Sequence, residues 1–303
     1  MATPLIVNLD GDLVPPDRAL VSVLDRGFLY GDSVYEVIRT YQRRPFELGA
    51  HLRRLAHSAE RIALVPRWDA PRTAEELERT LRAAEDLPLP PVDPEAAPWN
   101  RGEWSARVVM TRGAGELGLD PALAVDPLAV ILLEPSDGPK ELAYAEGVKV
   151  ALATVPRPPP EAVDPTAKTG AHLPHVLAMR EARAAGAHEA LLLDGRGRVT
   201  EGCSSSVFAV RKGTLVTPPL TAGILEGVTR GLVLALARSE RVAVEEVLLE
   251  PEDLLTADEA FLTSTSREIL PVTRVGERIV GDGRPGPVTA RLHRAFRRLT
   301  VRT

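Results

Sequence analysis

The sequence has one cysteine, few aromatic residues and no long apolar run. A single cysteine, Cys203, excludes an intrachain disulfide, which fits a reducing compartment, and we expect the cytoplasm. No apolar run approaches the roughly 20 residues that cross a bilayer, and no basic segment precedes an apolar one at the N-terminus. The sequence therefore predicts neither a membrane span nor a signal peptide.

A strongly basic surface is also lacking, because the net charge is −5 at pH 7, so nucleic acid is not an expected partner. Of the 303 residues, 44% are hydrophobic and 26% are charged, which is typical of a globular protein with room for two domains. The turn-forming run PSDGP at 135–139 predicts a linker. We place a small N-terminal α/β domain at 1–134, the linker at 135–145 and a larger C-terminal domain of mixed strands and helices at 146–303.

Hydrophobic periodicity predicts the secondary structure. Strands are expected at 5–8, 34–41, 105–111, 128–133, 148–154, 190–193, 198–200, 207–210, 215–217, 260–263 and 269–272. Helices are expected at 51–64, at 73–84 with Thr73 as the cap, at 173–185, from 228 onward and at 291–299. The proline-rich segments 87–103 and 156–165 are expected to be irregular. This order of elements favours an α/β (α+β-like) fold with many antiparallel strand pairs, and not alternating βαβ units.

Two of these elements place chemically useful side chains on one face. Residues three or four apart share a face of a helix, and residues two apart share a face of a strand. The residues concerned are His51, Arg54 and Ser58 on the helix at 51–64, and Tyr35, Val37 and Arg39 on the strand at 34–41.

An amine and a carboxylate stand out in the second half of the sequence. Lys168 lies in Ala-Lys-Thr-Gly before a predicted helix, and Glu201 follows 33 residues later in Thr-Glu-Gly. A lysine amine can form a Schiff base with pyridoxal phosphate. A carboxylate can keep the pyridine nitrogen of that cofactor protonated, so that the ring accepts electrons. An isolated lysine is more often a solvated surface charge, and a glutamate can cap a hairpin, so the surrounding motifs must decide.

Those motifs are distributed along nearly the whole chain. They are 25–36 (DRGFLYGDSVYE), 51–55 (HLRRL), 168–170 (KTG), 200–202 (TEG), 223–230 (GILEGVTR), 261–266 (FLTSTS) and 281–289 (GDGRPGPVT). In this order and at these spacings the sequence resembles the class IV aminotransferases, which are fold-type IV pyridoxal-phosphate enzymes. The group includes branched-chain aminotransferases, D-amino-acid aminotransferases and 4-amino-4-deoxychorismate lyases. The resemblance implies a two-domain fold-type IV enzyme.

The resemblance also implies a cofactor site. Lys168 is expected to form the Schiff base and to move a proton between the substrate and the cofactor, and Glu201 is expected to face the pyridine nitrogen. The phosphate is expected to bind Arg54, the backbone N–H groups of Val228 and Thr229, and the hydroxyl of Thr265. As an alternative, Thr229 is an ordinary first-turn helix residue and Thr265 an ordinary loop hydroxyl. No metal site is predicted.

The substrate side matches the family less uniformly. The residues assigned to it are Tyr35, Val37, Arg39, Arg107 and Ser264. Arg39 is expected either to meet a substrate carboxylate or to belong to a structural ion pair. Val37 resembles the D-amino-acid enzymes, whereas Arg107 occupies the position of an arginine in branched-chain enzymes. Those enzymes usually carry a tyrosine two residues before that arginine, where this sequence has Ser105.

Another departure follows the lysine. Many relatives have Lys-x-x-Asn-Tyr, whereas this sequence has His172 in place of the tyrosine. Either His172 contacts the cofactor or it is simply a polar residue at the start of a helix. Cys203 is expected to be a small packing residue and not a nucleophile.

The resemblance implies an aminotransferase that moves an amino group from an amino acid to a 2-oxo acid, with L-amino acids of branched-chain type favoured as donors. Alternatives are the lyase that forms 4-aminobenzoate and pyruvate from aminodeoxychorismate, and a D-amino-acid aminotransferase. A more distant alternative is a non-catalytic pyridoxal-phosphate-binding protein. The family forms homodimers in which the neighbouring chain partly covers the site, so a homodimer is expected.

Overall fold

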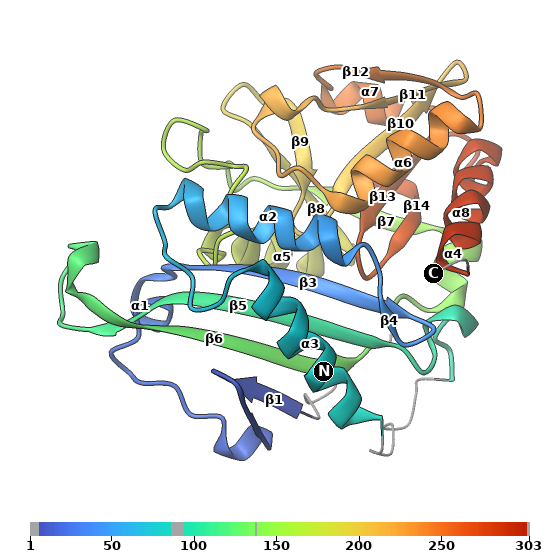
Figure 1. Cartoon of the computed structure of the whole chain (residues 1–303). Helices are drawn as coiled ribbons and strands as arrows, with labels where there is room; N and C mark the ends of the chain where they lie inside the picture. Colours follow the sequence, from blue (N-terminus) through green and yellow to red (C-terminus); the bar gives the residue numbers. More distant parts are fainter. Residues whose placement is uncertain (1–5, 86–93, 137, 302–303) are drawn as a thin grey trace.

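The computed structural model describes residues 6–85, 94–136 and 138–301, which form two sheets with helices packed against them (Figure 1). The strands of the first sheet lie within residues 6–135, and those of the second lie within 148–279. We keep the domain boundaries at 134 and 146 as a proposal. A short helix, α4 (Glu141–Glu146), lies at the end of the predicted linker.

The first sheet is antiparallel throughout, in the order β2-β1-β6-β5-β3-β4. Its strands are β1 (Ile6–Leu9), β2 (Asp12–Val14), β3 (Ser33–Tyr41), β4 (Arg44–Pro45), β5 (Trp104–Gly115) and β6 (Ala124–Pro135). The predicted alternation in β3 is confirmed, because Val34, Glu36 and Ile38 are buried and the intervening Tyr35 and Val37 are half-buried. One face of β3 therefore packs in the core, and the opposite face, with Tyr35 and Val37, is left available for a binding site.

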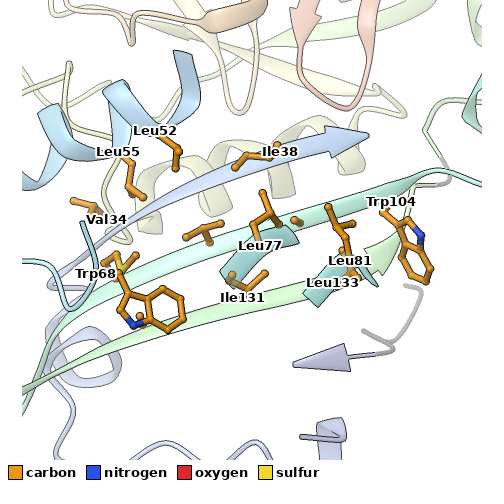
Figure 2. Packing of buried hydrophobic residues seen from close by; sticks show 14 of the residues in the cluster. Val34, Ile38, Leu52, Leu55, Trp68, Leu77, Leu81, Trp104, Ile131 and Leu133 are labelled. Atoms are coloured by element: carbon orange, nitrogen blue, oxygen red, sulfur yellow. The ribbon is translucent and has the colours of Figure 1, made fainter. Parts of the chain in front are cut away.

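Helices α2 (Leu48–Arg61) and α3 (Ala70–Ala84) cover one face of this sheet. Figure 2 shows the apolar side chains that meet between the helices and the sheet: Val34 and Ile38, Leu52 and Leu55, Leu77 and Leu81, Ile131 and Leu133, with Trp68 and Trp104. Removing such apolar area from water contributes about 25 cal/mol per Å². This core fixes α2 against β3, and α2 carries Arg54.

The N-terminus of α3 differs from the prediction. Asp69 caps the helix, and its carboxylate accepts a hydrogen bond from the N–H of Arg72 at 2.8 Å. Thr73, the predicted cap, lies inside the first turn and donates its hydroxyl to the carbonyl of Asp69 at 2.7 Å. The prediction was wrong because Pro71 is tolerated in a first turn, so the helix begins at Ala70.

The second sheet has the strand order β12-β11-β10-β13-β14-β7-β8-β9, with β15 beside β14. Its strands are β7 (Val148–Leu152), β8 (Glu189–Leu193), β9 (Val199–Gly202), β10 (Ser206–Arg211), β11 (Thr214–Thr217), β12 (Ala243–Glu246), β13 (Glu259–Ser264), β14 (Glu268–Val275) and β15 (Arg278–Ile279). Antiparallel pairs predominate, as predicted. Two parallel crossovers were not predicted: β7 to β8 through α5, and β11 to β12 through α6.

The remaining helices lie outside the sheets. They are α1 (Arg26–Tyr30), α5 (Leu173–Ala184), α6 (Val228–Ser239), α7 (Pro251–Leu255), α8 (Pro287–Thr300) and the 3₁₀ helices η1 (Pro16–Arg18), η2 (Pro98–Asn100), η3 (Pro121–Leu123) and η4 (Leu220–Ala222). Helix α5 ends before Gly186, whose φ of 63° lies in the left-handed region, as the sequence predicted. In the part of the chain that the structure describes, every helix is too short or too polar to cross a bilayer.

Candidate active site

A cavity of about 950 Å³ lies where the two sheets meet. Its walls include Tyr35 and Val37 of β3 on one side, and Glu201 of β9 and Thr263 of β13 on the other. Lys168 is also among its lining residues. The cavity therefore brings together side chains from the two halves of the sequence.

Lys168 is fixed through both its backbone and its amine. Its N–H donates to the hydroxyl of Ser58 at 3.0 Å, and its carbonyl accepts from the N–H of Tyr35 at 3.0 Å. Its Nζ donates to the hydroxyl of Tyr35 at 3.0 Å and lies 4.3 Å from the centre of that ring. The amine is thus held inside the cavity by a neutral partner and not by a carboxylate.

Close packing against β3 explains why glycine occupies position 170 in the Lys-Thr-Gly motif. The N–H of Gly170 donates to the carbonyl of Ser33 at 2.9 Å, so the segment after Lys168 lies directly on β3. A Cβ at position 170 would lie 2.3 Å from the hydroxyl oxygen of Ser33. A larger residue would force the Ser33 hydroxyl or the segment after Lys168 to shift, so glycine suits this close approach.

Glu201 is buried at the end of β9, and its carboxylate has two partners. One oxygen accepts the N–H of Leu225 at 3.0 Å, and the other pairs with the guanidinium of Arg157. Arg157 also lines the cavity, and the sequence motifs did not point to it. It follows the strand β7 in a proline-rich segment, where nothing in the local pattern distinguishes it from a surface arginine.

Arg54 is held at the cavity by a buried carboxylate. Its Nε and Nη2 donate to the two oxygens of Glu36 at 2.6 and 2.8 Å, and its Nη1 donates to the carbonyl of Glu226 at 2.9 Å. Burial raises the pKa of Glu36, but hydrogen bonds from Arg54 and His51 outweigh it and lower the pKa to about 2. Glu36 therefore stays ionised at neutral pH and fixes the arginine.

Glu36 received no role from the sequence motifs, although a signal was present. It is an acidic residue on the core-facing side of β3, between Val34 and Ile38, where the alternation predicts apolar residues. A carboxylate in such a position needs a cationic partner. The helical face of His51 and Arg54 supplies it, with the imidazole Nδ1 2.8 Å from Glu36.

The N-terminus of α6 opens into the cavity. Gly227 precedes the helix in an extended conformation, and no side chain from the described residues caps the helix. The free N–H groups of a first turn attract anions, and Val228 and Thr229 of this turn line the cavity. Thr265, from the turn between β13 and β14, lines the same cavity. The structure thus brings the residues predicted for the phosphate to one cavity.

The residues predicted for the substrate divide into two groups. Tyr35, Val37, Arg107 and Ser264 line the cavity, and the guanidinium carbon of Arg107 lies 4.9 Å from the centre of the Tyr35 ring. Arg39 does not. Its side chain is 1% exposed, and its Nη2 donates to the carbonyl of Trp99 and the side chain of Asn100 at 3.1 and 2.5 Å.

The expectation that Arg39 meets a substrate carboxylate is therefore corrected in favour of its alternative, a structural ion pair. Nη1 of Arg39 lies 3.4 Å from a carboxylate oxygen of Glu268. Alternation placed Arg39 on the correct face of β3, but it could not show that this end of the strand lies beyond the cavity.

His172 points into the cavity at the start of α5. Its ring packs edge-on against Tyr35, with the ring centres 5.0 Å apart, and its side chain does not cap the helix. Burial and the nearby charges of His175, Lys168 and Arg107 lower the pKa of His172 to about 4. The imidazole is thus neutral at neutral pH, where it fills the space beside Tyr35.

Cys203 lines the same cavity without becoming a nucleophile. Burial and the carboxylate of Glu189 raise the pKa of its thiol to about 11. A thiol protonated at neutral pH is a poor nucleophile. This agrees with its expected role as a small packing residue.

The residues of the cavity fit pyridoxal phosphate. An amine, a buried carboxylate, an arginine and an uncapped helix N-terminus correspond to the aldehyde, ring nitrogen and phosphate of that molecule. In addition, Nδ1 of His175 and Oγ1 of Thr263 are buried without a partner in the described residues, and both residues line the cavity. Unsatisfied buried polar atoms of this kind indicate a site that awaits a polar ligand.

Comparison with known proteins agrees with this geometry. The family model described as amino-transferase class IV matches residues 33–275. A putative branched-chain-amino-acid aminotransferase of Methanocaldococcus jannaschii is 36% identical over 96% of this chain and 95% of that protein. A D-alanine aminotransferase of Bacillus licheniformis is 31% identical over 96% of this chain and 95% of that protein.

Solved structures show the same fold. The branched-chain amino acid aminotransferase of Escherichia coli superimposes with a TM-score of 0.88 at 30% identity, covering 99% of this chain and 95% of that one. The branched-chain amino acid aminotransferase of Thermobaculum terrenum in its PLP-form gives a TM-score of 0.84 at 27% identity, covering 99% and 95%. The chain therefore belongs to the class IV aminotransferases and is a pyridoxal-phosphate-dependent enzyme that moves an amino group from an amino acid to a 2-oxo acid.

Proposed function

We propose that this aminotransferase uses L-amino acids of branched-chain type as donors, with Lys168 as the residue that carries the cofactor. The observation that supports it most is that Lys168, Glu201 and the N-terminus of α6 line one cavity. The 36% identity to a putative branched-chain-amino-acid aminotransferase supports the donor class.

Each residue has a separate task in this proposal. Bound pyridoxal phosphate supplies an electron sink for the substrate's Cα–H bond. Arg54, the first turn of α6 and Thr265 hold its phosphate, and Glu201 faces its ring nitrogen. Lys168 takes up and returns the proton at Nζ, while the hydroxyl of Tyr35 holds that atom in place.

Arg107 is the proposed partner of the substrate carboxylate. Its side chain is exposed in the cavity and forms no ion pair with any residue in the described parts of the chain. A guanidinium in a concave site can bind a carboxylate through two parallel hydrogen bonds. The ring of Tyr35 on one side limits the directions in which Arg107 can point.

Borohydride reduction of the holoenzyme, followed by peptide mapping, tests the role of Lys168. The chain has three other lysines, Lys140, Lys149 and Lys212, which lie outside the cavity and serve as internal controls. The label is expected on Lys168 alone and is expected to be lost in Lys168→Ala. A covalent label that survives in Lys168→Ala contradicts the proposal.

A panel of L- and D-amino acids with 2-oxoglutarate tests the donor class. Conversion of the bound cofactor to its pyridoxamine form is expected with L-leucine, L-isoleucine and L-valine. A D-amino-acid aminotransferase is the second candidate, because Val37 resembles those enzymes and a D-alanine aminotransferase is 31% identical. Conversion by D-alanine without conversion by L-leucine would replace the first candidate by the second.

We also propose that the enzyme is a homodimer. Phe28 and Tyr30 line the cavity and belong to a set of exposed apolar side chains that also includes Leu20, Val21, Val23, Leu24, Leu29, Leu117 and Leu119. Arg26 joins the two segments by donating to the carbonyls of Gly118 and Leu119 at 2.8 and 3.2 Å. An apolar surface of this kind is typical of a subunit interface. Sedimentation equilibrium is expected to give twice the chain mass, and a monomer at micromolar concentration would contradict this.

A cytoplasmic location is part of the same proposal. The single cysteine, Cys203, is partly buried and has a raised pKa, so it has neither an intrachain partner nor a reactive thiolate. Such a chain does not depend on an oxidising compartment. Cell fractionation with antibody detection tests the location, and recovery in a membrane or secreted fraction would contradict it.

A further inference from the structure

Glu268 is a buried carboxylate that lies outside the cavity. Its side chain is 0% exposed, and one oxygen accepts hydrogen bonds from the hydroxyl of Tyr41 and from Nη1 of Arg297, both at 2.7 Å. The other oxygen lies 2.9 Å from Nε2 of His293, and Arg39 approaches to 3.4 Å. Burial raises the pKa of Glu268, but these partners outweigh it and lower the pKa. The carboxylate is therefore an ionised centre shared by several donors.

The backbone at Glu268 shows that this position is held by its surroundings. Its φ of 56° lies in the left-handed region, which residues other than glycine rarely adopt. Ser264 pairs with Glu268 across β13 and β14, so Glu268 closes the turn 265–267. An unfavourable backbone conformation persists only where contacts determine it, and here the side-chain partners provide those contacts.

The same turn forms part of the cavity wall. Ser264, Thr265 and Ser266 line the cavity, and Thr265 belongs to the proposed phosphate site. Nη1 of Arg39, which pairs with Glu268, also lies 3.4 Å from the carbonyl of Ser266. The ion pair thus lies directly behind the turn, with one member bonded to the backbone of the turn.

The ion pair also joins the two sheets. Arg39 and Tyr41 belong to β3 of the first sheet, whereas Glu268 begins β14 of the second. β3 carries Tyr35 and Val37 on the cavity wall, four and two residues before Arg39. A shift of β3 relative to β14 would therefore move the substrate side and the phosphate side of the cavity apart.

We propose that Arg39 and Glu268 are positioning residues of the aminotransferase reaction, which hold the turn 265–267 at the distance from β3 that the cofactor phosphate requires. This inference rests on the phosphate site of the proposed function. Neither residue touches the cofactor. Each acts through the backbone of the turn, so removing either one misplaces Thr265 without removing a phosphate ligand.

The test is the dissociation constant of pyridoxal phosphate for apoenzyme, measured by fluorescence titration in the wild type, Arg39→Met, Glu268→Gln and the double variant. Circular dichroism at the temperature of the titration checks that each variant is folded. Each single variant is expected to raise the Kd about tenfold, because small misplacements weaken multipoint binding. The double variant is expected to bind no more weakly than the worse single variant, because both changes break the same pair.

Glu76→Gln is the matched control. Glu76 is also a buried carboxylate with arginine and amide partners, but it lies on α3, away from the cavity. It is expected to lower the stability to urea and to leave the Kd unchanged. Values within twofold of the wild type in folded Arg39→Met and Glu268→Gln overturn the inference and leave the pair a purely structural one.

Two further variants separate the possible failures. If the first two variants do not fold, Tyr41→Phe decides, because it removes one hydrogen bond to Glu268 and keeps the ring. A Kd raised about threefold supports the inference, and an unchanged Kd overturns it. Thr265→Ala tests the phosphate site itself. If Thr265→Ala leaves the Kd unchanged, the proposed phosphate site fails together with the inference, and if only Thr265→Ala weakens binding, the inference alone fails.

Discussion

The hydroxyl of Tyr35 accepts a hydrogen bond from Nζ of Lys168 at 3.0 Å, while the face of the same ring lies near Arg107. One side chain thus contacts the proposed cofactor lysine and the proposed carboxylate partner. Because β3 is held by core packing on its other face, the backbone that carries this ring is fixed relative to the sheet.

Tyr35→Phe isolates the hydroxyl. The ring and its contacts with both cations remain, so stability is expected to change by no more than about 1 kcal/mol. The turnover number is expected to fall about tenfold, because Nζ of Lys168 loses the partner that orients it. Steady-state kinetics with Tyr30→Phe as control checks this, since Tyr30 lines the cavity without contacting Lys168. Equal losses in both variants would contradict an orienting role.

Glu201→Gln is expected to weaken catalysis more than stability. The amide keeps the shape and can still accept the N–H of Leu225, but it loses the negative charge that pairs with Arg157 and that stabilises a protonated ring nitrogen. We expect the turnover number to fall by about two orders of magnitude or more. Thermal unfolding midpoints and kinetics are compared with those of Glu226→Gln, an exposed neighbour that lies outside the cavity. Full activity in Glu201→Gln would rule out the assigned role.

Glu36 makes the stability of the fold depend on pH. Its pKa is about 2 in the folded chain against an ordinary 4.5, so its ionised form stabilises the fold above pH 4.5. That contribution is on the order of 3 kcal/mol, at about 1.4 kcal/mol per pKa unit, and it is lost as the pH falls from about 4.5 towards 2. Urea unfolding at stepped pH is expected to show a steeper acid loss in the wild type than in Glu36→Gln. Parallel curves would contradict this.

His172 is expected to titrate near pH 4. Its lowered pKa means that the folded chain favours the neutral imidazole, so its contribution to stability is complete above pH 6.5 and falls as the pH drops towards 4. NMR of histidine-labelled protein measures the titration directly, with His172→Gln to assign the signal. A midpoint near 6.5 would show that the ring is solvated and does not pack in the cavity.

Gly170→Ala tests whether steric fit sets the lysine. The added methyl group would lie 2.3 Å from the hydroxyl oxygen of Ser33, so the loss of stability is expected to be about 1–3 kcal/mol. Adding Ser33→Ala removes that oxygen and is expected to restore part of the stability. Gly195→Ala is the control, because a Cβ there meets open space. An unaffected Gly170→Ala would show that the loop can relax.

The sequence was sufficient wherever local pattern and family motif agreed. Alternation placed Tyr35 and Val37 on one face of a strand, and the structure brings both to the cavity with Lys168. The same alternation failed for Arg39, because a pattern of period two identifies a face but not the point at which a cavity ends. The position of that limit depends on how β3 meets β14, which is a tertiary relationship.

Contacts between residues far apart in the sequence could not be predicted from local patterns either. Arg157 and Glu201 are 44 residues apart, and nothing in either local pattern indicates the other. Glu36 and Arg54, 18 residues apart, could have been matched from an acidic residue on a core face and a basic residue on a helix. The helix start at Asp69 was missed because Pro71 lies in the first turn, where proline is tolerated, so the helix extends ahead of Thr73.

Helix α6 begins at the cavity with no side-chain cap among the described residues, and its first turn faces the proposed phosphate position. A helix start of this kind is completed by a ligand, so occupancy adds RT ln(1 + [L]/Kd) to the free energy of unfolding. At a hundred times the Kd that is about 2.7 kcal/mol, which changes the unfolded fraction about a hundredfold. The concentration of free pyridoxal phosphate therefore sets in part how large a fraction of this chain is unfolded.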